Sequence, residues 1–386
     1  MDAEPHPIEI KSWPRFLVGG LMIARLLMLL ALPLEGLRGY GDFQHFFNLA
    51  AIPGWPYLDH WVEFPPIFPF LIELLYRISG AQQHTFDYLL FFILTAADVG
   101  SLLVFGRLLA HLNPPSALKR WLMYALALVA LAYAWWYFDS LPVLALLLGL
   151  LWIIEGREWR AGAVLGLGLI TKLFPALALA AAWRLLPPRR ALRVTLLTLG
   201  IGLIAYGGLY LAAPRFTAAS LISQGAKGSW ETVWALLDGN LRTGSFGPLV
   251  ERLEPALANV SSGQPARIPT WIPLGLAAAL GFWRFLKARR TPLAALALTG
   301  LAWCLLMLAS PGWSVQWTLY ALPFVLLLLP DKEAPLLVVT FTLVNLLEWP
   351  ILLSRGLFWA MPLTIILRAL LLVLLAIRFD QRARQP

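Results

Sequence analysis

Long runs of apolar residues, separated by short polar segments, follow one another along almost the whole chain. A run of about 20 apolar residues can cross the hydrocarbon core of a bilayer as an α-helix. The pattern therefore predicts an all-α polytopic membrane protein, with residues 1–386 in a single transmembrane domain and short helices in its outer loops. The predicted spans lie near residues 16–34, 86–106, 121–137, 141–154, 161–186, 192–212, 271–286, 292–309, 315–329, 335–350 and 357–377.

Two apolar stretches do not fit a straight span. Residues 66–78 are too short to cross a bilayer upright and contain two charges, so a tilted span and an interfacial helix both stay open. The run 161–186 contains Lys172 and Pro175. Because proline breaks the helical hydrogen-bond ladder, this run predicts a helical pair or a discontinuous helix.

The composition narrows the class of protein further. Hydrophobic residues make up 60% of the chain and charged residues only 13%, whereas a soluble domain has about 25% charged residues. Mean hydropathy is +0.73. The net charge of +9 does not indicate nucleic-acid binding, because the basic residues form short clusters between apolar runs. The single cysteine, Cys304, excludes an internal disulfide framework and a multi-cysteine metal site within one chain.

The basic clusters predict the topology. Lys11 and Arg15 precede the first run, so the positive-inside rule places the N-terminus in the cytoplasm. No small-residue cleavage site follows this run, which is therefore expected to be retained as the first helix. The other basic clusters, including the C-terminal tail, are expected on the same side of the plasma membrane. The loops expected together on the extracytoplasmic face are 35–65, 213–270, 310–317 and 348–356.

The first of these loops contains three acids, Asp42, Asp59 and Glu63, in a chain with few charges. Moving a sugar from a phosphate-linked donor to a hydroxyl needs a base, and a carboxylate can serve. Asp42 follows the first span closely, where the head of a lipid-linked donor would lie. Asp42 could also cap the helix expected after it. We favour the general base, with which capping remains compatible.

Lys172 lies in an otherwise apolar stretch, where a charge is expensive unless it is paired or lines a polar cavity. An ammonium group there could hold the donor phosphate and stabilise its developing charge. The alternative is that the side chain reaches out to the membrane interface.

Asp59 and Glu63 are candidates for binding sugar hydroxyls or a divalent cation. His45 and His60 have no fixed spacing to an acid, and the chain has no compact Asp-x-Asp pair, so metal dependence stays open. The 18 tryptophans suit either an interfacial aromatic belt or stacking on sugars. A soluble nucleotide-sugar donor is not supported, because no phosphate-binding glycine loop occurs.

Three patches of sequence resemble glycosyltransferase family 87, whose members have the GT-C fold and use polyprenol-phosphate-mannose. The patches keep the family order and extend over most of the chain. The matching residues are Tyr40, Asp42, Gly54, Pro56, Tyr57, Asp59, Glu63, Pro65 and Pro66 in the first, Gly162, Gly166, Lys172 and Pro175 in the second, and Ser310, Pro311, Trp313 and Trp317 in the third.

The resemblance implies roughly eleven transmembrane helices (about 10 to 13), a catalytic acid at Asp42 and inverting transfer on the outer face. The implied partners are membrane lipids, a polyprenyl-phosphate-sugar donor, commonly of mannose, and a lipid or glycan acceptor. No cofactor is certain, and a divalent cation stays open. The substrate-binding candidates are Tyr40, Tyr57, Asp59, Glu63, Asp139, Trp313 and Gln316.

The chain also departs from the family pattern. Val315 and Gln316 stand where many relatives have histidines, and Phe138, Asp139 and Ser140 replace a Gly-Gln-Asn-like turn. These changes leave the acceptor and the sugar open. The alternative function is a transporter or lipid flippase, for which a broken helix with an intramembrane lysine is also natural.

Overall fold

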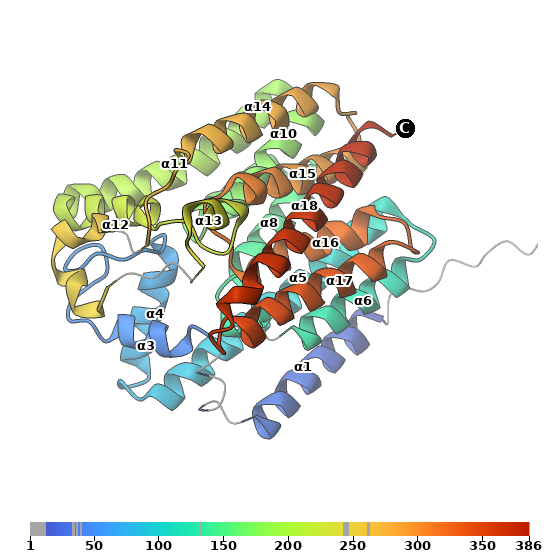
Figure 1. Ribbon diagram of the computed structural model, residues 1–386. Coiled ribbons are helices and arrows are strands. Elements are labelled where there is room, and N and C mark those ends of the chain that lie inside the picture. Colours follow the sequence, from blue (N-terminus) through green and yellow to red (C-terminus); the bar gives the residue numbers. More distant parts are fainter. Residues whose placement is uncertain are drawn as a thin grey trace, which may run out of the picture.

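The computed structural model describes residues 13–32, 35, 38, 41–131, 133–241, 247–260 and 263–385. Tyr40, one of the expected site residues, lies outside this set. In the described ranges the regular structure is helical, with two isolated β-bridges between loop residues (Figure 1). The predicted all-α class is confirmed.

Most helices of the bundle follow the predicted runs, whereas the run near 121–137 gives two helices, the first ending at Ala130 and the second beginning at Tyr133. Their bounds are α1 (Trp13–Ala31), α5 (Gln83–Leu112), α6 (Ala117–Ala130), α7 (Tyr133–Trp136), α8 (Ser140–Ile154), α11 (Pro188–Ala212), α14 (Trp271–Lys287), α15 (Pro292–Ala309), α16 (Thr318–Leu328), α17 (Ala334–Leu346) and α18 (Met361–Arg384).

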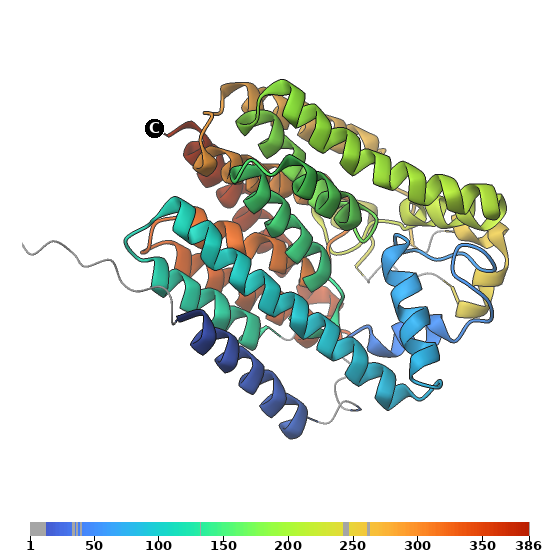
Figure 2. The same ribbon diagram turned by 180° about the vertical axis from the view of Figure 1, so that it is seen from behind.

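Six helical stretches in the described ranges are long and apolar enough to cross a membrane, and three shorter apolar helices accompany them. This confirms a polytopic membrane protein, while the number of about eleven spans stays a prediction. Within these stretches, 72% of the apolar window of α15 is buried, against 17% in α11. The central helix α15 is thus covered by other helices, whereas α11 presents a broad apolar face outward. From behind, α11 is seen to run along α9 on the outside of the bundle (Figure 2).

The run 161–186 is discontinuous, as predicted. Its parts are the helix α9 (Glu158–Leu169), the 3-10 helix η1 (Phe174–Ala178) and the helix α10 (Leu179–Leu185). Lys172 lies in the break, where the carbonyl of Ile170 accepts a hydrogen bond from the backbone N–H of Ile67 at 3.0 Å. Gly166 lets α9 approach α11, since a Cβ there would lie 2.7 Å from Ile201.

The short apolar stretch after the first loop forms α4 (Ile67–Ile78), which packs beside α3 (Phe43–Ala50) and against α5. Its 12 residues rise only about 18 Å, which is less than the thickness of a bilayer core. Its buried face includes Phe68, Ile72 and Leu75. The helix therefore positions the first loop against the bundle.

The polar segments collect at two ends of the bundle. At one, which we call the basic end, the predicted cytoplasmic clusters contact one another: Arg184 donates to the carbonyl of Arg289 at 3.2 Å, and Arg378 pairs with Glu333 at 3.2 Å. At the other, the loop end, Trp61 donates to the carbonyl of Glu251 at 3.0 Å. The C-terminus and α3 lie on opposite sides in Figure 1.

The loop end also contains α12 (Pro214–Ala226), α13 (Val233–Asp238), the 3-10 helices η2 (Leu249–Leu253), η3 (Pro255–Asn259), η4 (Val315–Trp317) and η6 (Phe358–Ala360), and the π-helix η5 (Leu347–Leu352). The backbone N–H of Trp230 donates to the carbonyl of Pro311 at 3.0 Å. The loops expected to gather therefore meet at this end of the bundle, while its extracytoplasmic location stays a prediction.

Candidate active site

Asp42 directly precedes α3, at the position of the helix N-cap. Its carboxylate nevertheless makes no capping hydrogen bond, and its φ and ψ of −91° and 6° are not those of a usual cap. The backbone N–H of Asp42 donates to the carbonyl of Trp136 at 3.4 Å. A Cβ at the preceding Gly41 would lie 2.7 Å from Trp136. The capping interpretation is therefore wrong for this side chain, which is left available for chemistry.

The charged neighbours of Asp42 come from four separate segments. Burial raises the pKa of this partly buried carboxyl group, and His45, Lys227 and Lys172 oppose that rise with their positive charges, while Asp139 adds to it. A raised pKa is typical of a carboxylate that must accept a proton near neutral pH. The nearby cations favour the ionised form of Asp42 and limit the rise of its pKa.

Lys172 forms an ion pair with Asp139 at 2.6 Å, and the hydroxyl of Tyr320 donates to the same oxygen of Asp139 at 3.0 Å. The lysine side chain is 17% exposed and that of Asp139 is fully buried. The interpretation that Lys172 extends to the interface is therefore wrong. In the described ranges, nothing hydrogen-bonds to the second oxygen of Asp139.

Three aromatic rings surround the ammonium group of Lys172. It lies 4.9 Å from the ring centre of Phe138, 5.7 Å from that of Phe174 and 5.5 Å from that of Trp317. Cation–π attraction at such distances contributes about 0.5–2 kcal/mol per ring, depending on desolvation. The rings and Asp139 together hold the ammonium group at one position in the break between α9 and η1.

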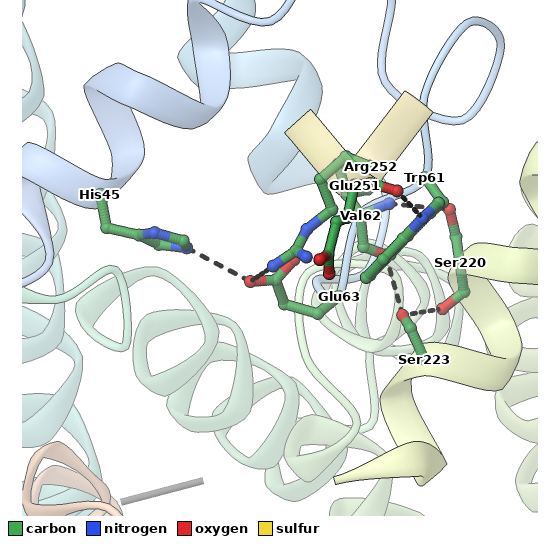
Figure 3. Close-up of polar contacts among 8 residues, drawn as sticks. All are labelled: His45, Trp61, Val62, Glu63, Ser220, Ser223, Glu251 and Arg252. Carbon is green, nitrogen blue, oxygen red and sulfur yellow. Dashed lines mark hydrogen bonds and ion pairs between the residues drawn. The ribbon is translucent and has the colours of Figure 1, made fainter. Parts of the chain in front are cut away.

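Glu63 connects the first loop to the loop 213–270. Its Oε1 lies 3.2 Å from Nε2 of His45 and 3.2 Å from the guanidinium of Arg252, as Figure 3 shows. Burial alone would raise the pKa of Glu63, but the hydrogen bond from His45 and the charges of Arg252 and Lys227 outweigh it and lower the pKa to about 2. Glu63 therefore stays ionised.

The pKa of His45 shifts in the opposite direction to that of Glu63. Burial lowers its pKa, but the hydrogen bond with Glu63 and the charges of Glu63 and Asp42 prevail, so the pKa of His45 is raised. His60 differs, since burial lowers its pKa to about 4. His45 is thus the histidine of the first loop whose surroundings favour its protonated form.

The end of the first loop is fastened by α12 and η2 (Figure 3). The backbone N–H of Val62 donates to Oγ of Ser220 at 3.0 Å, and the ring of Trp61 lies 4.1 Å below the guanidinium of Arg252. Ser223 in turn donates to the carbonyl of Val62 at 3.4 Å. These contacts fix Glu63 in place, because it follows Val62 directly.

Tyr57 and Asp59 make contacts that shape the first loop. The hydroxyl of the buried Tyr57 donates to the carbonyl of Phe64 at 2.7 Å, and Asp59 accepts a hydrogen bond from the backbone N–H of Trp55 at 2.7 Å. Gly54, at a φ of +92°, leaves room for Asp59, since a Cβ there would lie 2.4 Å from it. Their expected substrate contacts stay a prediction.

Trp313 and Gln316 lie at the loop end, and both are buried. The indole N–H of Trp313 donates to Asn345 at 3.1 Å, and its ring packs edge-on against that of Trp317. The structure thus places Trp313 behind the ring that covers Lys172, while Gln316 precedes that ring in η4. Both remain candidates without a direct contact to Asp42.

The residues that sequence reasoning missed are Arg252, Lys227 and Tyr320. Arg252 is separated from Glu63 by 189 residues, and Tyr320 from Asp139 by 181. The one available signal was that Arg252 and Lys227 belong to the polar loop 213–270. In the described ranges, no group of three His, Cys, Asp or Glu residues is arranged around a common point that could hold a metal ion.

Comparison with known proteins gives one match. The model of glycosyltransferase family 87 matches residues 64–311, well over half of the chain. The matched range includes Asp139, Lys172 and Arg252, and begins just after Glu63. No curated protein and no solved structure matches the chain.

Proposed function

The chain belongs to glycosyltransferase family 87 and is a membrane glycosyltransferase, and we propose that it moves a sugar from a polyprenyl-phosphate-linked donor to an acceptor hydroxyl. Mannose is the first candidate for this sugar. The observation that carries this proposal is the Asp42 carboxylate, which makes no capping hydrogen bond and lies among the charges of Lys172, Lys227 and His45. This arrangement supports the proposal, because a carboxylate that can act as a base lies near cations that can attract a phosphate.

Asp42 acts as the general base in this proposal. It takes the proton of the acceptor hydroxyl while the acceptor oxygen bonds to the anomeric carbon of the sugar. The bond between that carbon and the phosphate oxygen breaks, and its electron pair leaves with the polyprenyl phosphate. A single displacement of this kind inverts the anomeric configuration. The acceptor is a lipid or a glycan.

Lys172 binds the donor phosphate in this proposal. Its ammonium is held by Asp139, and Asp139 is itself fixed by Tyr320, so the charge is in place before the phosphate arrives. A preorganised charge stabilises the negative charge that develops on the leaving group without reorganisation during the reaction. The aromatic rings around Lys172 exclude water and strengthen that attraction.

We place the loop end on the extracytoplasmic face of the plasma membrane and the basic end, with both termini, in the cytoplasm. The support is the positive-inside rule, applied to the clusters that meet at the basic end. A donor anchored by a polyprenyl tail would then reach Asp42 and Lys172 from the surrounding bilayer.

The test uses the purified protein in liposomes that contain radiolabelled polyprenyl-phosphate-mannose and a panel of lipid and glycan acceptors. We expect transfer by the wild-type protein, with the product of inverted configuration by NMR. Asp42→Asn should lower kcat by about 10²- to 10⁴-fold, the usual contribution of a general base.

The matched control is Asp331→Asn, the same change at the basic end, where Asp331 pairs with Arg120 at 2.6 Å. It should leave kcat unchanged. Thermal unfolding in detergent checks that Asp42→Asn is folded. Turnover by a folded Asp42→Asn protein at the wild-type rate would rule out Asp42 as the base, and retention of configuration would rule out a single displacement.

A further inference from the structure

A second ammonium group lies at the loop end, on the segment that follows α12. Lys227 is half-buried and lies 5.5 Å from the ring centre of Trp230. Burial lowers the pKa of Lys227, the charges of Arg252 and Lys172 add to that effect, and Glu63 and Asp42 oppose it. Lys227 therefore shares its electrostatic surroundings with Asp42 and Lys172, although it is distant from both in sequence.

Each of the two lysines lies beside one ring of a tryptophan pair. The ring centres of Trp230 and Trp317 are 6.5 Å apart, with Lys227 over the first and Lys172 over the second, each at 5.5 Å. Two backbone hydrogen bonds join the segments that carry these rings: one from Trp230 to the carbonyl of Pro311, at 3.0 Å, and one from Trp313 to the carbonyl of Trp230, at 3.1 Å.

The charges of the described site residues leave an excess of one positive charge when His45 is protonated and Asp42 is ionised. The members of this group are the cations Lys172, Lys227, Arg252 and His45 and the carboxylates Asp42, Asp139 and Glu63. Without Lys227 the group would be neutral. A phosphodiester donor carries one negative charge, so Lys227 supplies the charge that matches it.

The reaction changes the charge of the phosphate and the net charge of the site at the same time. Breaking the sugar–phosphate bond turns the diester into a polyprenyl monophosphate, which approaches two negative charges because its second pKa is about 6. The proton taken from the acceptor neutralises Asp42, so the site gains one positive charge at the same moment. With both lysines present, the excess positive charge of the site therefore matches the negative charge of the donor before transfer. It also matches the negative charge of the leaving phosphate after transfer.

We propose that Lys227 is a second phosphate-binding residue, and that Lys172 and Lys227, each beside one ring of the Trp230–Trp317 pair, bind the donor phosphate together. This inference rests on the proposed function, because it needs a polyprenyl-phosphate donor. Lys227 belongs to the loop 213–270, so that loop contributes directly to donor binding and to stabilisation of the leaving group.

The experiment measures binding without turnover. Farnesyl phosphate, a short polyprenyl monophosphate, is titrated into the detergent-solubilised full-length protein at pH 8, with farnesol as the uncharged probe and inorganic phosphate as the tail-free probe. We expect Lys227→Met to weaken farnesyl phosphate binding by about 10- to 100-fold and to leave farnesol binding unchanged. Lys227→Arg should stay within about threefold of wild type, because it keeps the charge.

Arg215→Met is the matched control, since it removes one positive charge from the exposed start of α12. It should bind farnesyl phosphate like the wild-type protein. In transfer assays, Lys227→Met should raise KM for the donor and also lower kcat, because the leaving phosphate gains charge as the bond breaks.

Three outcomes are distinguishable. If Lys172→Met weakens farnesyl phosphate binding and folded Lys227→Met and Lys227→Gln do not, the inference about Lys227 is overturned and the proposed function stands. An equal loss in Arg215→Met would also overturn it, because the effect would then be one of net charge. If neither lysine affects binding and no polyprenyl-phosphate sugar supports transfer, the proposed function itself fails.

Discussion

The two ends of the bundle use charge in different ways. At the basic end, Arg193 lies 3.2 Å from Glu158 in a partly exposed pair, whose side chains are 48% and 13% exposed. At the loop end, the pair of Arg252 with Glu63 is buried, with side chains that are 2% and 5% exposed. Exposed pairs contribute little to stability and mainly set topology, whereas buried charges are costly and persist only where their partners are in place.

The sequence separations sharpen this contrast. Glu158 and Arg193 are 35 residues apart and are joined by α9, η1, α10 and the start of α11. Glu63 and Arg252 are 189 residues apart and come from different loops. The buried pair of Glu63 with Arg252 therefore forms only when these distant segments are folded together. Substitutions in this pair thus test how far the site depends on the complete fold.

Of the variants that test this contrast, Lys172→Met should have the largest effect on activity. It removes the proposed phosphate contact and leaves Asp139 buried without its partner, so we expect kcat/KM to fall by about 10²- to 10³-fold. Steady-state transfer assays measure this. The double variant Lys172→Met with Asp139→Asn relieves the buried charge and should recover thermal stability but not activity. Recovery of activity in the double variant would mean that Lys172 only neutralises Asp139.

Arg252→Met should destabilise the protein. It leaves Glu63 buried with one partner fewer, and breaking a buried pair by removing one member costs about 3–5 kcal/mol. Thermal unfolding in detergent measures the loss, with Arg193→Met as the matched substitution at the basic end. Adding Glu63→Gln should restore part of the stability; a double variant that unfolds as easily as Arg252→Met would argue against the Glu63 pairing.

The pH dependence of transfer tests the charge on His45. A protonated Asp42 cannot accept a proton, so activity should fall as the pH drops through the raised pKa of Asp42. Protonated His45 favours the ionised form of Asp42 and holds that pKa down. His45→Gln should therefore move the acid limb of the kcat/KM profile up by about one pH unit, whereas His45→Lys should not.

His111→Gln provides the control for the pH profile, because His111 lies at the basic end, 3.6 Å from Glu155. Its acid limb should coincide with that of the wild-type protein. If the acid limb of a folded His45→Gln protein is not shifted, the charge of His45 does not influence the pKa of Asp42.

Arg193→Ala should have the smallest effect. The partly exposed pair with Glu158 is worth about 0–1 kcal/mol, so thermal unfolding should change little and transfer not at all. If Arg193→Ala lowers thermal stability as much as Arg252→Met does, the partly exposed pair is as important for stability as the buried pair.

Much of the fold could be predicted from the sequence, because apolar runs and basic clusters are local signals. The runs near 86–106, 141–154 and 292–309 became α5, α8 and α15 with nearly the expected bounds. The break at Lys172 was also foreseen, since a proline and a charge within one run are visible without any structure. A buried pair such as Arg25 with Asp98, at 2.9 Å, was not foreseen, because it joins two different helices.

The sequence by itself thus determined the membrane class, the order of the helices, the grouping of the outer loops and the residues Asp42 and Lys172 as candidates. Only the tertiary structure decided what surrounds them: that Asp42 does not cap α3, that Lys172 pairs with Asp139, and that Arg252 and Lys227 approach Glu63 and Asp42. The physical reason is that a helix is specified by neighbouring residues, whereas the field at a carboxylate depends on charges that distant segments bring within a few ångströms.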